Sequence, residues 1–280
     1  SPAAEPTPTS TSTSTPTLSR REESTALPVA ATTRASTAPP LQPNLFSALD
    51  PKPAAAFTSP VMPSKITANS GEQAFERPPL PIDQRAAALE VIDQEVIACV
   101  RCPVLVQSRT RTVFGEGPVN PRLMFVGEAP GADEDRPGRP FVGRAGQLLN
   151  DMIVKGMGIQ REDVYIANSN KCRPPENRAP EPAEIAHCRP FLTRQIEILR
   201  PEFLCLLGRT AVLSLLETAL PMHRLRQRWH RYRGIPTIVT YHPSYLLRNP
   251  ASKKDAWEDL KLLMEAMGLK PPARREDQAT

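Results

Sequence analysis

The chain has 280 residues, and its 35 Lys and Arg outnumber its 30 Asp and Glu, which gives a net charge of +5 at pH 7. No stretch approaches the roughly 18 consecutive apolar residues of a membrane-spanning helix, and no basic segment leads into an apolar secretory signal. We therefore expect no membrane association and a cytoplasmic location, as for an intracellular protein of bacterial type. We also expect a monomer. The mild positive charge fits a polyanionic partner without identifying one.

Prolines concentrate at the start of the chain, where 15 of the 33 lie within the first 85 residues among runs of Ser, Thr and Ala. This segment shows no apolar periodicity, so it cannot bury enough apolar surface to offset the entropy of ordering it. We expect a disordered tail over residues 1–81, one folded domain over residues 82–270 and a C-terminal tail over residues 271–280. The sequence identifies no partner for the N-terminal tail.

Helical and strand patterns alternate through the rest of the chain. The strand runs are too short and too uniformly apolar for amphipathic helices, which is typical of strands buried on both faces. This alternation predicts an α/β fold with a mostly parallel sheet between helices, in which ligands bind beyond the carboxyl ends of the strands. In chain order, we expect the helix Ile82–Ile97, the strand Leu123–Val126, the helix Arg144–Met157, the strand Val164–Ala167, the helix Glu181–Leu199, the strand Phe203–Leu207, the helix Thr210–Leu216, the strand Thr237–Thr240 and the helix Lys253–Met267.

The five cysteines fall into a pattern that favours metal binding. Cys99 and Cys102 form a C-x2-C pair after the first helix, and Cys172 and Cys188 flank a proline-rich loop that follows the second strand. Two neighbouring and two distant thiolates suit either tetrahedral zinc or a [4Fe–4S] cluster, and the spacing alone does not choose between them. Cys205 lies within an apolar strand run, so we interpret it as a buried core thiol.

Polar groups suited to ligand binding follow the first two predicted strands. A glycine-rich segment over residues 127–146 lets the backbone approach a ligand closely and point N–H groups at it. Four acidic residues near its start suit Mg²⁺, although solvated loop carboxylates are the interpretation that we favour. After the second strand, Asn168 and Asn170 can form turns, and an amide can also offer a donor and an acceptor to a base edge.

The segment after the fourth strand, Tyr241–Pro250, is unusual for a surface loop. A single histidine beside a strand, such as His242, most often has only a structural hydrogen bond. Here we expect Leu246 and Leu247 to be exposed beside Arg248, and an exposed apolar pair next to a cation suits insertion between stacked bases.

A basic stretch with two aromatic residues, Arg224–Arg233, precedes the fourth strand. It fits a contact with phosphates and fits equally well a solvated helix or hairpin face.

Taken in order, these motifs resemble those of the type 4 uracil-DNA glycosylases over residues 82–269. The related type 5 enzymes have Leu where this chain has Glu128, which favours type 4. A further relative traps uracil covalently through an inserted basic loop, and this chain has no such insertion after the first motif. The matching segments are Gly127-Glu-Ala-Pro-Gly131, Gly138-Arg-Pro-Phe-Val-Gly143, Asn168 with Lys171-Cys-Arg-Pro-Pro175, Cys188-Arg-Pro-Phe191 and His242-Pro-Ser-Tyr-Leu-Leu247.

The resemblance implies a three-layer α/β/α fold around a four-stranded parallel sheet. It also implies DNA repair chemistry, in which uracil is flipped out of single- or double-stranded DNA and its bond to the sugar is hydrolysed, leaving an abasic site. The cofactor that it implies is a structural [4Fe–4S] cluster, whose ligands are Cys99, Cys102, Cys172 and Cys188.

The same resemblance implies roles for the pocket residues. His242 would face a carbonyl of the base. As our own mechanistic hypothesis, His242 donates a hydrogen bond to the developing uracil anion, and Glu128, the carboxylate best placed by sequence, orients or deprotonates the attacking water. Phe141 would stack on the base, and Asn168 would select uracil over cytosine. The floor of the pocket would be formed by Gly127, Glu128 and Ala129.

Two alternatives stay open at this point. The first is a non-catalytic nucleic-acid-binding module built on a four-cysteine metal site, which leaves the polar residues at three strand ends unexplained. The second is an interaction protein in which the N-terminal tail acts and the domain has lost its activity.

Overall fold

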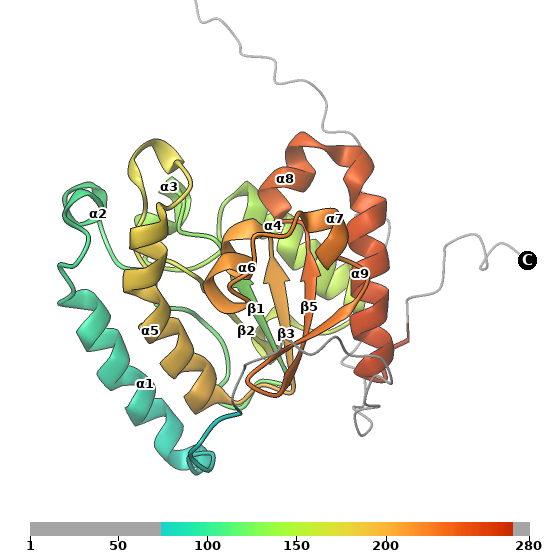
Figure 1. Cartoon of the computed structure of the whole chain (residues 1–280), viewed down its shortest axis with the longest axis horizontal. Coiled ribbons are helices and arrows are strands. Elements are labelled where there is room, and N and C mark those ends of the chain that lie inside the picture. Colours follow the sequence, from blue (N-terminus) through green and yellow to red (C-terminus); the bar gives the residue numbers. More distant parts are fainter. Residues whose placement is uncertain (1–73, 271–280) are drawn as a thin grey trace, which may run out of the picture. The chain divides into compact units, whose positions relative to one another are not determined.

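A five-stranded sheet forms the centre of the described part of the chain, residues 74–270 of a computed structural model (Figure 1). The strand order is β2-β1-β3-β5-β4, in which the first four strands run parallel and β4 pairs with β5 in the antiparallel direction at the edge. The strands are β1 (Leu123–Gly127), β2 (Val164–Asn168), β3 (Phe203–Leu207), β4 (Trp229–Tyr232) and β5 (Ile235–Thr240).

Helices cover both faces of this sheet. One face packs against α1 (Ile82–Ile97), α5 (Pro182–Leu199) and α6 (Arg209–Leu215). The other face packs against α4, its π-helical continuation, α8 and α9, which span Arg144–Asp151, Met152–Met157, Pro243–Arg248 and Lys253–Ala266. Short helical segments complete the described chain: α2 (Pro103–Ser108), α3 (Ala132–Asp135), α7 (Met222–Leu225) and the 3₁₀ turns Arg161–Asp163, Pro175–Asn177 and Pro250–Ser252.

Alternate residues of each central strand enter opposite cores. In β1, Phe125 belongs to the core beneath α4 and α9, whereas Met124 and Val126 belong to the core beneath α5 and α6. All residues of β1 are buried, which explains why its sequence is uniformly apolar. Burying each such side chain stabilises the fold by about 1.5–3 kcal/mol.

The predicted α/β fold and its four parallel strands are confirmed, and the predicted helices agree with the structure to within one or two residues. The edge strand β4 was not predicted, because its sequence Trp229–Tyr232 reads as part of a basic stretch. Arg224–Arg233 is not a fully solvated face, since Arg226 and His230 are buried. Arg224 and Arg228 are exposed, so a contact with phosphates stays a prediction. Arg226 Nε donates to Asp259 at 2.7 Å, inside the domain.

Residues 74–81, which the sequence assigned to the tail, lie against the domain. Phe75 packs against the core beneath α5, and the Arg200 guanidinium carbon lies 3.8 Å from the centre of its ring. Arg200 also donates to the backbone oxygen of Arg77 at 2.6 Å. The folded part therefore begins before Pro81. The predicted tails over residues 1–73 and 271–280 lie outside the described residues, so their disorder stays a prediction.

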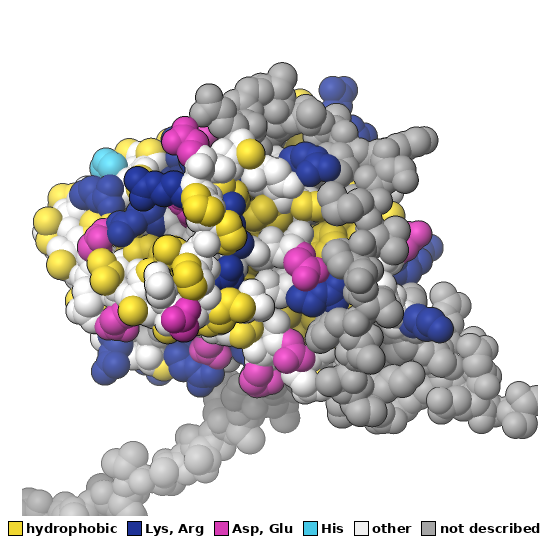
Figure 2. Space-filling model, turned by 90° about the horizontal axis from the view of Figure 1, so that it is seen from below, with side chains coloured by type: hydrophobic (Ala, Val, Ile, Leu, Met, Phe, Trp, Pro, Cys, Tyr) yellow, Lys and Arg dark blue, Asp and Glu magenta, His cyan; other side chains and the backbone are white. Residues whose placement is uncertain are grey.

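Different parts of the molecule lie at the two ends of the sheet. Figure 2 shows the end seen from below in Figure 1, where basic, acidic and hydrophobic side chains are interspersed. At the opposite end, toward which the parallel strands point, lie α3, α4, α7 and α8 (Figure 1). None of the helices in residues 74–270 combines the length and apolarity that crossing a bilayer requires.

Candidate active site at the carboxyl ends of the strands

A cavity of 480 Å³ lies beyond the carboxyl ends of β1, β2 and β5. Its volume is within the range of small-molecule sites. The register of the sheet pairs Gly127, the last residue of β1, with Asn168, the last residue of β2. Five of the predicted pocket residues line the cavity, namely Glu128, Ala129, Phe141, Asn168 and His242.

The base of the cavity is closely packed around Gly127. A Cβ atom at this position would meet Asn168 Oδ1 and come within 2.5 Å of the Phe141 ring, so only glycine fits. Phe141 is buried and has a φ of 53°, a left-handed conformation that costs a non-glycine residue about 1–3 kcal/mol. The fold holds this ring in place against backbone strain, a pattern concentrated at ligand sites.

Asn168 leaves one polar atom without a partner among the described residues. Its side chain is 2% exposed, and its Oδ1 atom has no hydrogen-bond donor within residues 74–270. An unsatisfied buried acceptor costs about 1–3 kcal/mol. A ligand that brings an N–H group into the cavity would remove this cost.

His242 has a defined tautomer and faces the same cavity. It is the N-cap of α8, and its Nδ1 accepts a hydrogen bond from the backbone N–H of Ser244 at 3.2 Å. The Ser244 hydroxyl also lies 2.8 Å from Nδ1. Because Nδ1 is an acceptor, the proton of the neutral ring is on Nε2, which is buried with no partner in the described structure. Burial and the nearby charge of Arg248 lower the pKa of His242 to about 4, so the ring is neutral near pH 7.

A hydrogen bond from a residue of α6 orients the Glu128 side chain. Its Oε2 accepts a hydrogen bond of 2.6 Å from the Thr210 hydroxyl, while the half-buried side chain lines the cavity. Oε1 of this carboxylate has no hydrogen-bond partner within residues 74–270. The Phe141 and His242 rings, which line the same cavity, have centroids 5.6 Å apart.

The remaining acids of the glycine-rich segment have mostly structural roles. Glu134 Oε1 accepts from the N–H groups of Val142 and Gly143 at 2.9 and 2.8 Å, which holds the loop that carries Phe141. Asp135 is buried and accepts from the N–H of Thr110. The interpretation of these acids as solvated carboxylates is therefore wrong for Glu134 and Asp135.

The expectation that Leu246 is exposed is wrong. Leu246 is fully buried in the core between the sheet and α9, because it lies on the inner face of α8. Leu247 is half-buried, and Arg248 is exposed and lines the cavity. The exposed large side chain of this helix is instead Tyr245, at 37%.

Several residues of the site were not identified as such from the sequence. Gly208 directly follows β3 and has a φ of +85°, and a Cβ there would lie 2.9 Å from the Cβ of His242. Its place directly after a strand is the signal that would have found it. Thr210 and Ser244, which orient Glu128 and His242, carry no signal of their own in a single sequence.

The cysteine-flanked loop forms one wall of the cavity. Pro174, Asn177 and Arg178 line it, and they lie between Cys172 and Cys188 in the sequence. Arg178 is held by a bidentate ion pair with Glu184 of α5, at 2.7 and 2.8 Å. Any group that fixes the two cysteines therefore also fixes this wall.

The four predicted ligand cysteines are free thiols gathered beside this loop. Burial and the charges of the other three raise the pKa of Cys102 to about 11. Cys205 lies apart from this group, fully buried in the core as predicted. Among the described residues, no three Cys, His, Asp or Glu side chains are arranged to hold a single metal ion.

Each of the four sulfurs has a nitrogen partner, which fits a negatively charged cluster. Arg101 Nε lies 3.4 Å from Cys99, Arg109 Nη1 2.9 Å from Cys172 and His187 Nδ1 3.4 Å from Cys102. The backbone N–H of Lys171 bonds to Cys188. Lys171 is itself buried, and its ammonium donates to the backbone oxygen of Asn168 at 3.0 Å.

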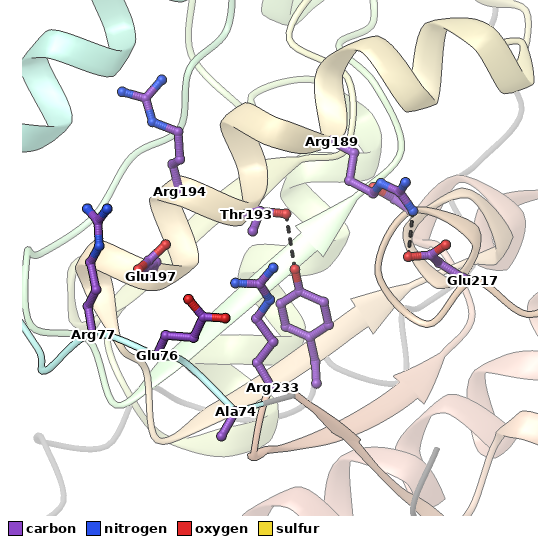
Figure 3. Close-up of a pocket in the computed structure, with 11 residues that line it drawn as sticks. Ala74, Glu76, Arg77, Arg189, Thr193, Arg194, Glu197, Glu217 and Arg233 are labelled. Carbon is purple, nitrogen blue, oxygen red and sulfur yellow. Dashed lines mark hydrogen bonds and ion pairs between the residues drawn. The ribbon is translucent and has the colours of Figure 1, made fainter. Parts of the chain in front are cut away.

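A larger cavity, of 720 Å³, lies between α5, α6, the end of β4 and the segment before α1 (Figure 3). Its walls are mostly charged, and an ion pair of 2.6 Å joins Arg189 to Glu217 there. It contains none of the predicted site residues, so its size does not make it the candidate site.

Comparison with known proteins agrees with this geometry. The family model described as "Uracil DNA glycosylase superfamily" matches residues 114–261. The chain is 44% identical to the type-4 uracil-DNA glycosylase of Thermotoga maritima over 171 residues, which cover 60% of this chain and 88% of that protein. It is 44% identical to the type-4 uracil-DNA glycosylase of Sulfurisphaera tokodaii over 186 residues (64% and 84%), but 31% identical to the type-5 enzyme of Pyrobaculum aerophilum over 183 residues (54% and 80%). The chain belongs to the uracil-DNA glycosylase superfamily and, within it, to the type-4 uracil-DNA glycosylases.

Proposed function

We propose that this chain is a uracil-DNA glycosylase of base excision repair, which binds uracil flipped out of DNA and hydrolyses the bond between base and sugar. The observation that carries the proposal is that Asn168 Oδ1 and His242 Nε2 are buried, have no hydrogen-bond partner within residues 74–270, and belong to residues that line one cavity beside the Phe141 ring. The relatives reported above carry the same activity in their names.

The cavity suits the hydrogen-bonding edge of uracil. Asn168 Oδ1 can accept from the N3–H of uracil while its amide nitrogen donates to O4. Cytosine presents the opposite pattern, with an amino group at position 4 and no proton on N3. Phe141 offers a stacking face, and Ala129, which lines the cavity, leaves space for the ring because its side chain is small. Gly127 does not line the cavity, and its lack of a side chain lets Asn168 and Phe141 pack against it.

His242 supplies the hydrogen bond that matters in the reaction. Breaking the C–N bond leaves positive charge on the sugar and negative charge on the base. A neutral imidazole that donates from Nε2 stabilises the uracil anion as it forms, in a buried site where such a bond is strong. The cap to Ser244 fixes the ring beforehand, so little reorganisation is needed.

Water must then reach the sugar carbon, and Glu128 is the carboxylate of the cavity suited to orient it. The bond from Thr210 occupies one carboxylate oxygen and leaves the other for the water. Leu247 and Arg248 are the proposed DNA contacts of α8, whereas Leu246 has no such role because it is buried.

We also propose that Cys99, Cys102, Cys172 and Cys188 hold a [4Fe–4S] cluster, since four free thiols with N–H partners suit it. When bound, the cluster serves structure rather than redox chemistry in this hydrolysis. It would fix the loop that forms the Pro174 wall of the cavity. The free thiols also favour a reducing, intracellular compartment, where the chain would act as a monomer.

The competing proposal of a non-catalytic nucleic-acid-binding module explains the cysteines but not the convergence of Gly127, Asn168 and His242 at three strand ends. The tail-based interaction protein rests on residues outside the described structure.

The function is tested by incubating purified protein with an oligonucleotide that contains one uracil, followed by alkali and strand-length analysis. We expect cutting at the uracil alone, and a loss of about 100- to 1000-fold in rate for His242→Ala, the cost of removing one such donor. An otherwise identical oligonucleotide with thymine in place of uracil is the control. DNA binding without any cutting would favour the binding module instead.

Asn168→Asp tests base selection. A carboxylate only accepts hydrogen bonds, so it would oppose O4 of uracil and favour the amino group of cytosine. We expect uracil excision to fall and cytosine excision to appear, measured by release of free base. A variant that excises uracil normally and still rejects cytosine would exclude this role for Asn168.

The excision rate should depend on pH through His242. Burial lowers the pKa of His242 from 6.5 to about 4, so the folded protein favours the neutral ring. The contribution of this ring to the stability of the folded protein is therefore complete above pH 6.5 and is lost as the pH falls toward 4. Protonation of Nδ1 would set it against the Ser244 N–H. We expect the excision rate of the wild type to stay constant with falling pH until the pH nears 4 and then to decline. The residual excision rate of His242→Gln should not show this decline. A decline centred near pH 6.5 would contradict the assignment.

The cluster is tested with two matched cysteine variants. Cys172→Ser should lower the iron content and the visible absorbance of the purified protein and reduce its thermal stability, because a ligand is lost. Cys205→Ser changes a buried core thiol and should leave the iron content unchanged. Equal iron content in wild type and Cys172→Ser would remove Cys172 from the ligand set.

A further inference from the structure

A second cavity, of 420 Å³, adjoins the first and shares Glu128, His242, Ser244 and Arg248 with it. Its remaining walls come from the end of β3, α7, the end of β5 and α8. A ligand bound through the first cavity can therefore continue directly into the second. The mechanism described above uses the first cavity alone.

Two stacked tyrosines form one side of this second cavity. The ring centroids of Tyr241 and Tyr245 lie 4.8 Å apart with an interplanar angle of 31°. Tyr245 is 37% exposed, so part of its ring contacts Tyr241 and part is open to solvent. An exposed aromatic ring beside a cavity offers a surface on which a base can stack.

The stack is anchored in the interior of the domain. The Arg226 guanidinium carbon lies 4.1 Å from the centre of the Tyr241 ring, on a side chain that is itself buried. Arg226 donates to the fully buried carboxylate of Asp259 at 2.7 Å, which fixes the guanidinium. Asp259, Arg226, Tyr241 and Tyr245 thus form a continuous stack from the core to the surface.

The charges around the cavity suit a phosphate backbone. Arg209, His223 and Arg248 are exposed residues that line it. Neither Arg209 nor Arg248 forms an ion pair with any other residue of the described range 74–270. A planar stacking face beside unpaired cations matches a nucleotide better than a peptide or a lipid headgroup.

We propose that this second cavity binds the nucleotide adjacent to the extruded uracil, with its base stacked on Tyr245 and its phosphate beside Arg209 and Arg248. The inference rests on the proposed function, because the uracil in the first cavity determines which nucleotide reaches the second. Tyr245 then takes the place that the sequence had suggested for Leu246, and it acts by stacking on a neighbouring base rather than by filling the gap in the duplex.

The test measures binding to single-stranded oligonucleotides that carry one uracil on a 2′-fluorinated sugar, which resists cleavage, so that the uracil can occupy the first cavity while binding is measured. Three oligonucleotides are compared: one with both neighbouring bases, one without the 5′ base and one without the 3′ base. Wild type, Tyr245→Ala and Tyr245→Phe are measured by fluorescence anisotropy. Val91→Ala, an exposed apolar residue of α1, serves as the remote control.

We expect Tyr245→Ala to weaken binding of the oligonucleotide with both bases by about 5- to 150-fold, the usual effect of removing one base-stacking residue. The loss should vanish on the oligonucleotide that lacks the stacked base, which also identifies the 5′ or 3′ side. Tyr245→Phe keeps the ring and should bind as the wild type does, as should Val91→Ala.

Unchanged binding by Tyr245→Ala, or an equal loss on all three oligonucleotides, would overturn the proposal, since the second result marks a general structural effect. This outcome is separate from failure of the proposed function. Uracil excision by the wild type is measured independently, and the binding pattern can be measured whether or not excision occurs.

Discussion

The register between β1 and β2 is the constraint on which the site depends. It places Gly127 opposite Asn168 where both strands end, and the missing side chain at Gly127 lets the Asn168 amide and the Phe141 ring approach each other. Because the neighbouring strands are parallel, β3 and β5 end at the same edge and bring Gly208 beside His242. A slip of one residue would turn the Asn168 side chain to the other face of the sheet.

The site also contains features that lower the stability of the folded protein. Phe141 has a strained backbone, and Asn168 and His242 each keep a buried polar atom without a partner among the described residues. Other buried polar atoms also lack a partner among the described residues, as for the Asn170 amide, but Asn168 and His242 are the two such residues that line the strand-end cavity. Unsatisfied atoms that line one cavity mark the place where a ligand completes the structure.

Much of this could be predicted from the sequence, because buried parallel strands are uniformly apolar and their ends carry the polar residues. The strands, the main helices and the convergence of Asn168 and His242 follow from that pattern. The edge strand β4 was not predicted because its buried Trp229 and Tyr232 flank His230 and Arg231 within a basic stretch and show no alternating pattern. Leu246 was misjudged because its burial depends on how α8 lies on the sheet, which no local pattern encodes. The partners of Glu128 and His242 depend likewise on tertiary contacts.

The position of bound uracil is tested most directly by a crystal structure of the protein with free uracil. We expect the ring to stack on Phe141, with N3–H directed at Asn168 Oδ1 and one carbonyl within hydrogen-bond distance of His242 Nε2. Uracil bound in the charged cavity between α5 and α6, or in the strand-end cavity without contact to either Asn168 or His242, would contradict it.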